Sequence, residues 1–174
     1  MITLIIGGAR SGKSRYAEQL AQAKQKPVLY IATATALDDE MSARIAHHQQ
    51  RRPINWQLLE CPLELSKTLA IETTKNQTIL VDCLTLWLNN QLFQVPQQSF
   101  SILFEELISS INNSQADIIF VANEVGLGII PLGEISRKFV DEAGRLNQRL
   151  AQIADKVFFI AAGLPLTLKG EHRD

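Results

Sequence analysis

The chain has 174 residues, 46% hydrophobic and 20% charged, with a formal net charge of −1 and two cysteines. This length predicts one domain, the apolar fraction excludes a disordered chain, and the near-neutral charge argues against a general nucleic-acid or anionic-membrane surface. No apolar run reaches the roughly 20 residues of a membrane span, and the apolar N-terminal stretch is too short for a signal peptide. Cys61 and Cys83 lack metal-ligand spacing. We therefore expect a cytoplasmic protein.

Six short apolar runs predict β-strands. Most of them are continuously apolar, which is typical of strands that are covered on both faces of a sheet. In chain order they are Ile2–Ile6, Val28–Ala32, Trp56–Glu60, Ile79–Asp82, Ile118–Ala122 and Val157–Ala161.

Helical patterns lie between these strands, and the clearest has apolar residues at steps of three and four. The predicted helices are Ser14–Lys24, Asp38–Gln50, Leu63–Thr73, Leu84–Phe93, Phe100–Asn112 and Ile135–Ile153, and the polar stretch Gln94–Ser99 is the best loop. Strand–helix alternation predicts an α/β fold with a mainly parallel sheet, right-handed crossovers and helices on both faces. We expect a single domain over residues 1–169 and a polar tail over Gly170–Asp174.

The first strand leads into a complete phosphate-binding motif. Residues 7–14 read GGARSGKS and fit G-x-x-x-x-G-K-S between a predicted strand and a predicted helix, as the motif requires. The two motif glycines permit positive φ, so that backbone N–H groups approach phosphate oxygens, and the helix N-terminus adds partial positive charge. Lys13 is predicted to act on the β- and γ-phosphates. The predicted nucleotide-binding residues of this loop are Gly7, Gly8, Ala9, Arg10, Ser11, Gly12, Lys13 and Ser14.

Asp82 ends the fourth predicted strand, where residues 78–82 read TILVD. In P-loop enzymes such an aspartate holds the Mg²⁺ shell from the strand next to the phosphate loop. Many core strands end in aspartate at a turn, and the phosphate loop favours the metal-binding interpretation here. Ser14 and Asp82 are therefore the predicted ligands of Mg²⁺.

The chain lacks the further motifs of two large P-loop classes. Residues 123–126 read NEVG instead of the base-reading N-K-x-D of a GTPase, and no Asp-x-x-Gly switch follows Asp82. A nucleic-acid motor would need a longer chain and a basic tract. These differences leave a compact metabolic kinase or a nucleotidyl-transfer enzyme.

His47 is the candidate nucleophile. It lies about 200° from the apolar Ile45 on a helical wheel, and so shares an outward face with Arg44 and Arg51. Two guanidiniums disfavour the imidazolium, and a neutral imidazole beside phosphate-binding arginines is suited to attack phosphorus. The alternative, a solvated face with two surface histidines, is the one that periodicity alone favours. His47 and His48 point about 100° apart, which argues against a zinc site.

Several segments together resemble a known family. They read GGARSGKS, VLYIATATALDDEMSARIAHHQQRRP, VDCLTLWLNN, NEVGLGIIP and RKFVDEAGRLNQRLAQIAD. From residue 1 to about Lys169, the chain resembles the bifunctional adenosylcobinamide kinase/adenosylcobinamide-phosphate guanylyltransferase family of cobalamin biosynthesis, which has a RecA-like P-loop fold. The patterns RI-x-HH-x-x-x-RP and NEVG-x-GI-x-P carry most of the specificity.

The resemblance implies two reactions. In the first, the γ-phosphate of ATP or GTP passes to the aminopropanol hydroxyl of adenosylcobinamide. In the second, a histidine that matches His47 attacks the α-phosphate of GTP, releases pyrophosphate and passes GMP to adenosylcobinamide phosphate, which gives adenosylcobinamide-GDP. Mg²⁺ is the expected cofactor, and the family suggests a homotrimer.

Further family positions match residues outside the phosphate loop. The substrate is expected to contact Asn123 and Glu124, which follow a buried strand at its carboxyl end, where ligands of open α/β sheets bind. For Glu60, a simple turn residue is the alternative, and Val140 stands where the family often has arginine. The resemblance implies nucleotide contacts at Ala32, Thr33, Ala34, His48, Gln49, Gln50, Arg51, Glu60 and Asp82.

Two other functions stay open at this point. A plain small-molecule kinase would phosphorylate an alcohol but form no GMP–protein adduct. A nucleotide-gated interaction module would bind nucleotide without turning over cobinamide, and the missing GTPase motifs count against it.

Overall fold

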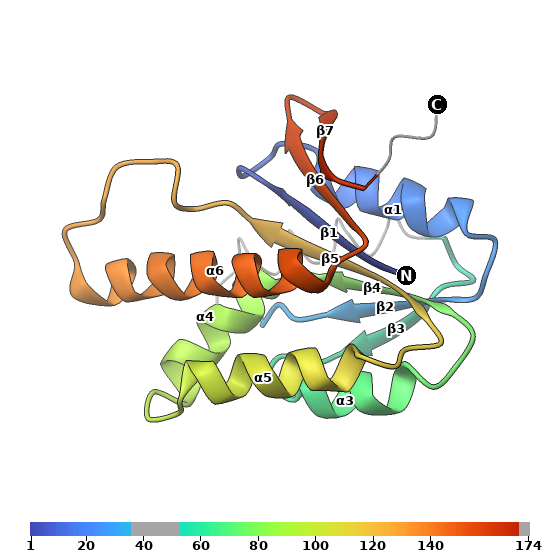
Figure 1. Ribbon diagram of the computed structural model, residues 1–174, viewed down its shortest axis with the longest axis horizontal. Helices are drawn as coiled ribbons and strands as arrows, with labels where there is room; N and C mark the ends of the chain where they lie inside the picture. Colours follow the sequence, from blue (N-terminus) through green and yellow to red (C-terminus); the bar gives the residue numbers. More distant parts are fainter. Residues whose placement is uncertain (36–52, 171–174) are drawn as a thin grey trace.

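The computed structural model describes residues 1–35 and 53–170, which form one seven-stranded sheet covered by helices. The sheet order is β3-β2-β4-β5-β1-β6-β7 (Figure 1). Strands β1 to β6 run parallel, and β7 is antiparallel to β6. The strands are β1 (Ile2–Gly7), β2 (Val28–Ala32), β3 (Gln57–Glu60), β4 (Thr78–Asp82), β5 (Asp117–Asn123), β6 (Lys156–Ala161) and β7 (Leu164–Lys169).

Helices cover both faces of this sheet (Figure 1). In the described part of the chain, α1 packs on one face through Ala17 and Ala21, and the other helices pack on the opposite face. None of the helices in these residues is both long and apolar enough to cross a bilayer. The helices are α1 (Lys13–Ala23), α3 (Leu65–Glu72), α4 (Leu84–Gln94), α5 (Phe100–Ile111) and α6 (Glu134–Ile153).

The alternation of side chains along each strand divides the core into two layers. On β4, Leu80 faces the α1 layer, whereas Ile79 and Val81 face the layer of α3 to α6, and all three are fully buried. Because both faces are covered, the strand has no solvent side and its sequence is continuously apolar. Full burial of each such side chain stabilises the fold by roughly 1.5–3 kcal/mol.

Helix α6 is buried only in its second half. Its apolar stripe packs against the sheet at Ala143, Leu146 and Leu150. Near its start Ile135 is 48% exposed, where the helix projects past the sheet (Figure 1). The predicted stripe is therefore present, but part of it has no partner within the described residues.

The predicted elements agree closely with the structure. Every strand and helix predicted within the described residues is confirmed, with its ends within two residues of those observed. The loop over Gln94–Ser99 joins α4 to α5, and the Ser99 hydroxyl accepts a hydrogen bond from the Ile102 N–H group. The predicted helix Asp38–Gln50 lies outside the described residues, as do residues 171–174 of the predicted tail.

Strand β7 has no counterpart among the predicted strands. It follows β6 through Ala162 and Gly163, whose φ values of 51° and 80° are left-handed, as in a two-residue hairpin turn. The pair Ala-Gly lacks the asparagine or aspartate that marks many such turns, and Pro165 argues against a central strand. The proline is tolerated because β7 lies at the edge of the sheet, where one side forms no ladder.

Candidate active site

The phosphate loop connects β1 to α1 and depends on two glycines. Gly7 and Gly12 have φ values of 153° and 99°, which favour glycine over residues with a side chain. A Cβ atom on Gly7 would collide with the carbonyl oxygen of Ile160, and one on Gly12 would lie 3.1 Å from the Cα atom of Gly163. The loop therefore packs tightly against the end of β6 and the turn that follows it.

The β6–β7 turn also supports the loop by a hydrogen bond. The Gly163 N–H group donates to the carbonyl oxygen of Ser11 at 2.8 Å. Sequence reasoning missed this support, because it joins residues about 150 positions apart and carries no local pattern. The hairpin is thus part of the structure that shapes the phosphate loop.

Lys13 is the cation of the loop and is 6% exposed. Its ammonium donates to the Gly8 carbonyl oxygen at 2.6 Å. Burial lowers the pKa of Lys13 from its ordinary value, and the negative charge of Asp82 acts in the opposite direction. Lys13 and Asp82 thus lie within electrostatic reach of each other. Ser14 is the next residue, in the first turn of α1.

Asp82 lies at the carboxyl end of β4, and its Oδ2 atom accepts a hydrogen bond from the Tyr30 hydroxyl at 2.9 Å. The prediction that Asp82 lies on the strand next to the phosphate loop is wrong, because β5 separates β4 from β1. Chain order does not determine strand order in a parallel sheet, since each crossover can pass over a neighbouring strand. Asp82 nevertheless stays within electrostatic reach of Lys13.

Asn123 and Glu124 lie at the carboxyl end of β5, next to the start of the phosphate loop. Asn123 ends β5 and pairs with Gly7 in the register of β1. The Glu124 N–H group donates to the Gly7 carbonyl oxygen at 2.9 Å, and the Asn123 N–H group donates to the Thr85 hydroxyl at 2.6 Å. The structure therefore brings both predicted substrate residues to the edge of the phosphate loop.

The residues at the end of β2 differ in burial. Thr33 is completely buried, and its hydroxyl donates to the Cys83 carbonyl oxygen at 2.7 Å and accepts from the Cys83 N–H group at 2.9 Å. The Thr33 side chain thus fastens the end of β2 to the end of β4. Ala32 and Ala34 are only partly buried.

Glu60 is exposed at the end of β3, on the far edge of the sheet. In the sheet order, β2, β4 and β5 lie between β3 and β1, which separates Glu60 from the phosphate loop by roughly 19 Å. The structure does not bring Glu60 next to Lys13. His47, His48, Gln49, Gln50 and Arg51 lie outside the described residues.

Two buried hydroxyls at the carboxyl edge lack partners. Within the described residues, Ser11 Oγ and Thr35 Oγ1 form no hydrogen bond although neither atom is exposed. Such atoms are uncommon in folded proteins, because the loss of hydration is not offset. Ser11 belongs to the predicted loop, whereas nothing in the sequence pattern singled out Thr35.

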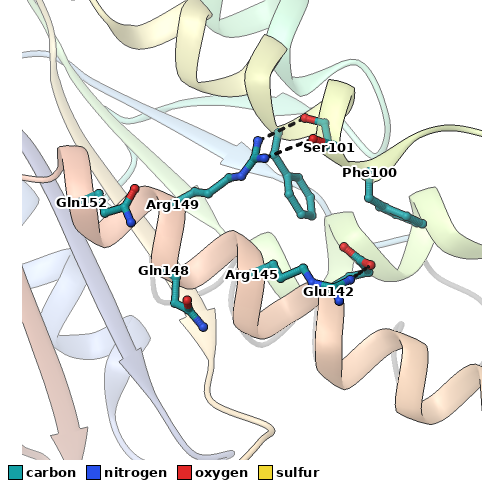
Figure 2. Close-up of a pocket in the computed structure, with 8 residues that line it drawn as sticks. Phe100, Ser101, Glu142, Arg145, Gln148, Arg149 and Gln152 are labelled. Atoms are coloured by element: carbon teal, nitrogen blue, oxygen red, sulfur yellow. Dashed lines mark hydrogen bonds and ion pairs between the residues drawn. The ribbon is translucent and has the colours of Figure 1, made fainter.

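A separate hollow of about 530 Å³ lies between α5 and α6, on the sheet face opposite α1 (Figure 2). Arg149 donates to the Ser101 carbonyl oxygen and hydroxyl at 3.2 and 3.1 Å, and Arg145 pairs with Glu142. Both arginine side chains are thus bonded to other residues that line the hollow. The hollow is lined by Phe100, Ser101, Phe104, Glu142, Arg145, Gln148, Arg149 and Gln152.

A glycine-rich loop between the first strand of a parallel sheet and a helix, with a buried lysine near a strand-end aspartate, defines a P-loop NTPase-type nucleotide-binding protein. Solved structures share this fold. A Pyrococcus horikoshii OT3 protein has a TM-score of 0.57 at 8% identity, over 99% of this chain and 87% of that one. The ATP synthase subunit NeqB of Nanoarcheaum equitans has a TM-score of 0.52 at 14% identity, over 92% of this chain and 45% of that one. At these identities the likeness concerns the fold alone.

The family comparison is more specific. Residues 3–168 match the family described as "Cobinamide kinase / cobinamide phosphate guanyltransferase", and the chain belongs to this family. The "Bifunctional adenosylcobalamin biosynthesis protein CobP" of Pseudomonas aeruginosa PAO1 is 52% identical over 98% of this chain and 99% of that protein. The CobU proteins of Salmonella typhimurium LT2 and Escherichia coli K12 are 41% and 38% identical, each over 97% of this chain and 100% of the relative. The resemblance seen in the motifs is confirmed.

Proposed function

We propose that this chain catalyses both reactions that its family's description names. It phosphorylates adenosylcobinamide with ATP or GTP, and it then transfers GMP from GTP to adenosylcobinamide phosphate in the cytoplasm. The observation that supports this most strongly is the match to the family over residues 3–168, which includes a complete phosphate loop. A kinase without guanylyl transfer is the alternative, and it would form no covalent adduct with GMP.

The kinase reaction uses the phosphate loop. The substrate hydroxyl oxygen forms a bond to the γ-phosphorus and loses its proton to solvent, the bond to the bridging oxygen breaks, and the nucleoside diphosphate leaves. Such transfers depend on positioning and charge stabilisation, which Lys13 and the loop N–H groups supply. Ser14 and Asp82 would hold Mg²⁺, which when bound neutralises phosphate charge. One hydroxyl and one carboxylate suit Mg²⁺, because it takes oxygen ligands and usually keeps several waters.

The guanylyl transfer uses His47. An imidazole nitrogen forms a bond to the α-phosphorus of GTP, the bond to the β-phosphate oxygen breaks, and pyrophosphate leaves. A phosphate oxygen of adenosylcobinamide phosphate then attacks the same phosphorus, and the bond to nitrogen breaks, which restores His47. The sequence supports this role by placing His47 between Arg44 and Arg51, since a neutral imidazole is the nucleophilic form.

The remaining predicted residues would contact ligands around this centre. Asn123 and Glu124 would contact the cobinamide substrate from the edge of the phosphate loop. Thr33 would act by holding the ends of β2 and β4 together, because its hydroxyl is engaged with Cys83. The nucleotide contacts comprise the loop residues, Ala32, Ala34, Glu60 and residues 48–51.

We also propose a homo-oligomer, with a trimer as the expected state. An exposed apolar loop after β5 supports self-association, because monomeric proteins seldom leave large apolar patches in water. Its most exposed apolar residues are Leu127, Ile129, Ile130 and Leu132, at 78%, 96%, 78% and 98%.

The direct test is covalent labelling. Purified protein is incubated with Mg²⁺ and GTP labelled in the α- or the γ-phosphate, denatured, and examined for label on the chain. We expect an acid-labile adduct from α-labelled GTP that disappears in His47→Ala and persists in His48→Ala. No α-label on the wild-type chain would contradict guanylyl transfer and leave a simple kinase. Loss of the adduct only in His48→Ala would show that His48, and not His47, is the nucleophile.

A further inference from the structure

We propose that Tyr30 positions the Asp82 carboxylate for Mg²⁺, which rests on the metal-binding role proposed for Asp82. Tyr30 lies in the middle of β2, is 3% exposed, and donates its hydroxyl hydrogen to Asp82 Oδ2 at 2.9 Å. The sequence assigned no role to Tyr30, because a buried aromatic residue in a strand has the pattern of an ordinary core residue. In the structure its hydroxyl contacts Asp82, which lies within electrostatic reach of Lys13 in the phosphate loop.

The register of the sheet explains how the two side chains meet. Tyr30 pairs with Leu80 and Ala32 pairs with Asp82 across β2 and β4. Tyr30 and Leu80 belong to the core layer under α1. Residues two apart along a strand share a face, so the Asp82 side chain also projects on the α1 side. Ser14, in the first turn of α1, belongs to the same side of the sheet.

The hydrogen bond gives the two carboxylate oxygens of Asp82 different roles. Oδ2 is held by Tyr30, which leaves Oδ1 for the metal ion or for a water bound to it. The bond also restricts rotation of the carboxylate. Groups that orient a metal ligand in this way typically change metal affinity about 10–100-fold. The backbone beside Asp82 is held as well, through the paired hydrogen bonds of Thr33 with Cys83.

Tyr30→Phe isolates the hydroxyl. The ring packs near Trp56, with centroids 6.5 Å apart, and phenylalanine preserves this packing. The second tyrosine of the chain, Tyr16, offers a matched control. Tyr16 lies on α1 in the same core layer, and its ring meets the edge of Phe158 at 5.4 Å. Tyr16→Phe makes the same chemical change without removing a bond to Asp82.

The experiment measures metal binding instead of turnover alone. Mn²⁺ replaces Mg²⁺ as a probe, and free Mn²⁺ is followed by electron paramagnetic resonance in the presence of a non-hydrolysable GTP analogue. We expect Tyr30→Phe to weaken Mn²⁺ binding about tenfold or more. Affinity for the analogue in EDTA and the thermal midpoint should stay near wild type, and Tyr16→Phe should leave all three unchanged. Raising Mg²⁺ should restore the phosphoryl transfer rate of Tyr30→Phe, which a general structural defect would not allow.

Asp82→Asn separates the inference from the proposal on which it rests. If Asp82→Asn binds Mn²⁺ as tightly as wild type, the metal-binding role of Asp82 is wrong. If Asp82→Asn weakens binding but Tyr30→Phe does not, the role of Asp82 stands and the positioning by Tyr30 is overturned. In the double variant we expect Tyr30→Phe to add no further loss. Additive losses would mean that the hydroxyl acts independently of Asp82, which also overturns the inference.

Discussion

Lys13 is a buried cation, and burial disfavours its charged form. In the structure its ammonium is bonded to the Gly8 carbonyl oxygen, and the charge of Asp82 favours the protonated state. A bound phosphate chain would offset the remaining cost of burial. At the scale of single residues, the site is thus arranged for a strongly anionic ligand.

Lys13→Met tests this arrangement. Methionine keeps most of the side-chain volume but removes the charge, so we expect the rate of γ-phosphate transfer to fall by about 10²–10³-fold, as when one preorganised electrostatic group is lost. The thermal midpoint should not fall, because the buried charge carries a desolvation cost. Lys67→Met is the control, since Lys67 is exposed and its ion pair is with Glu64, one turn away on the surface. A transfer rate within threefold of wild type would contradict the role of Lys13.

At the scale of elements, the β6–β7 hairpin supports the phosphate loop. The turn donates one hydrogen bond to Ser11 and lies against Gly12, while Gly7 packs on the end of β6. These contacts restrict the loop from the side opposite β5. A loop that is already ordered loses less conformational entropy when it binds phosphate.

Substitutions at Gly163 measure that support. Gly163→Pro removes the N–H donor and cannot adopt the φ value of 80°, so we expect nucleotide affinity to fall roughly tenfold, the equivalent of about 1.4 kcal/mol. Gly163→Asn keeps the N–H group, tolerates left-handed φ, and has open space for its side chain, so it should bind nucleotide almost as wild type does. Isothermal titration with a non-hydrolysable nucleotide gives both affinities. Equal affinities for the two folded variants would show that the turn does not support the loop.

At the scale of the whole molecule, the loop after β5 exposes a run of apolar side chains within the part of the chain that the structure describes. The apolar loop at 127–132 and the start of α6 extend past the sheet (Figure 1), and Ile135 on that helix is half exposed. This loop follows Asn123 and Glu124 in the chain, and the Glu124 N–H group is bonded to the Gly7 carbonyl oxygen.

Ile129→Asp tests whether this surface joins copies of the chain. Ile129 is 96% exposed, so aspartate should leave the fold intact but disfavour burial in an interface. Light scattering after size exclusion should give wild type about three times the 19.4 kDa chain mass, and the variant a smaller mass. Ile54→Asp is the control, because Ile54 is equally exposed elsewhere. A variant mass equal to that of wild type would place the interface on another surface.

Much of this protein is determined by local sequence. The continuously apolar strands follow from a sheet covered on both faces, and helices such as α5 follow from their period and the Ser99 cap. The motif GGARSGKS determines the phosphate loop, because glycine conformations, a helix N-terminus and a lysine come together within eight residues. These features need no distant contact, so pattern and spacing are sufficient to predict them.

Contacts between distant residues required the tertiary structure. The insertion of β5 between β1 and β4, the bond from Tyr30 to Asp82, and the support of Ser11 by Gly163 each join segments that are far apart in sequence. Strand order depends on which crossovers pack together, and a hydrogen bond across the sheet depends on register. Neither leaves a local periodicity. The sequence by itself therefore determined the phosphate-loop motif and the α/β class, whereas the tertiary structure decided which distant residues contact the phosphate loop and Asp82.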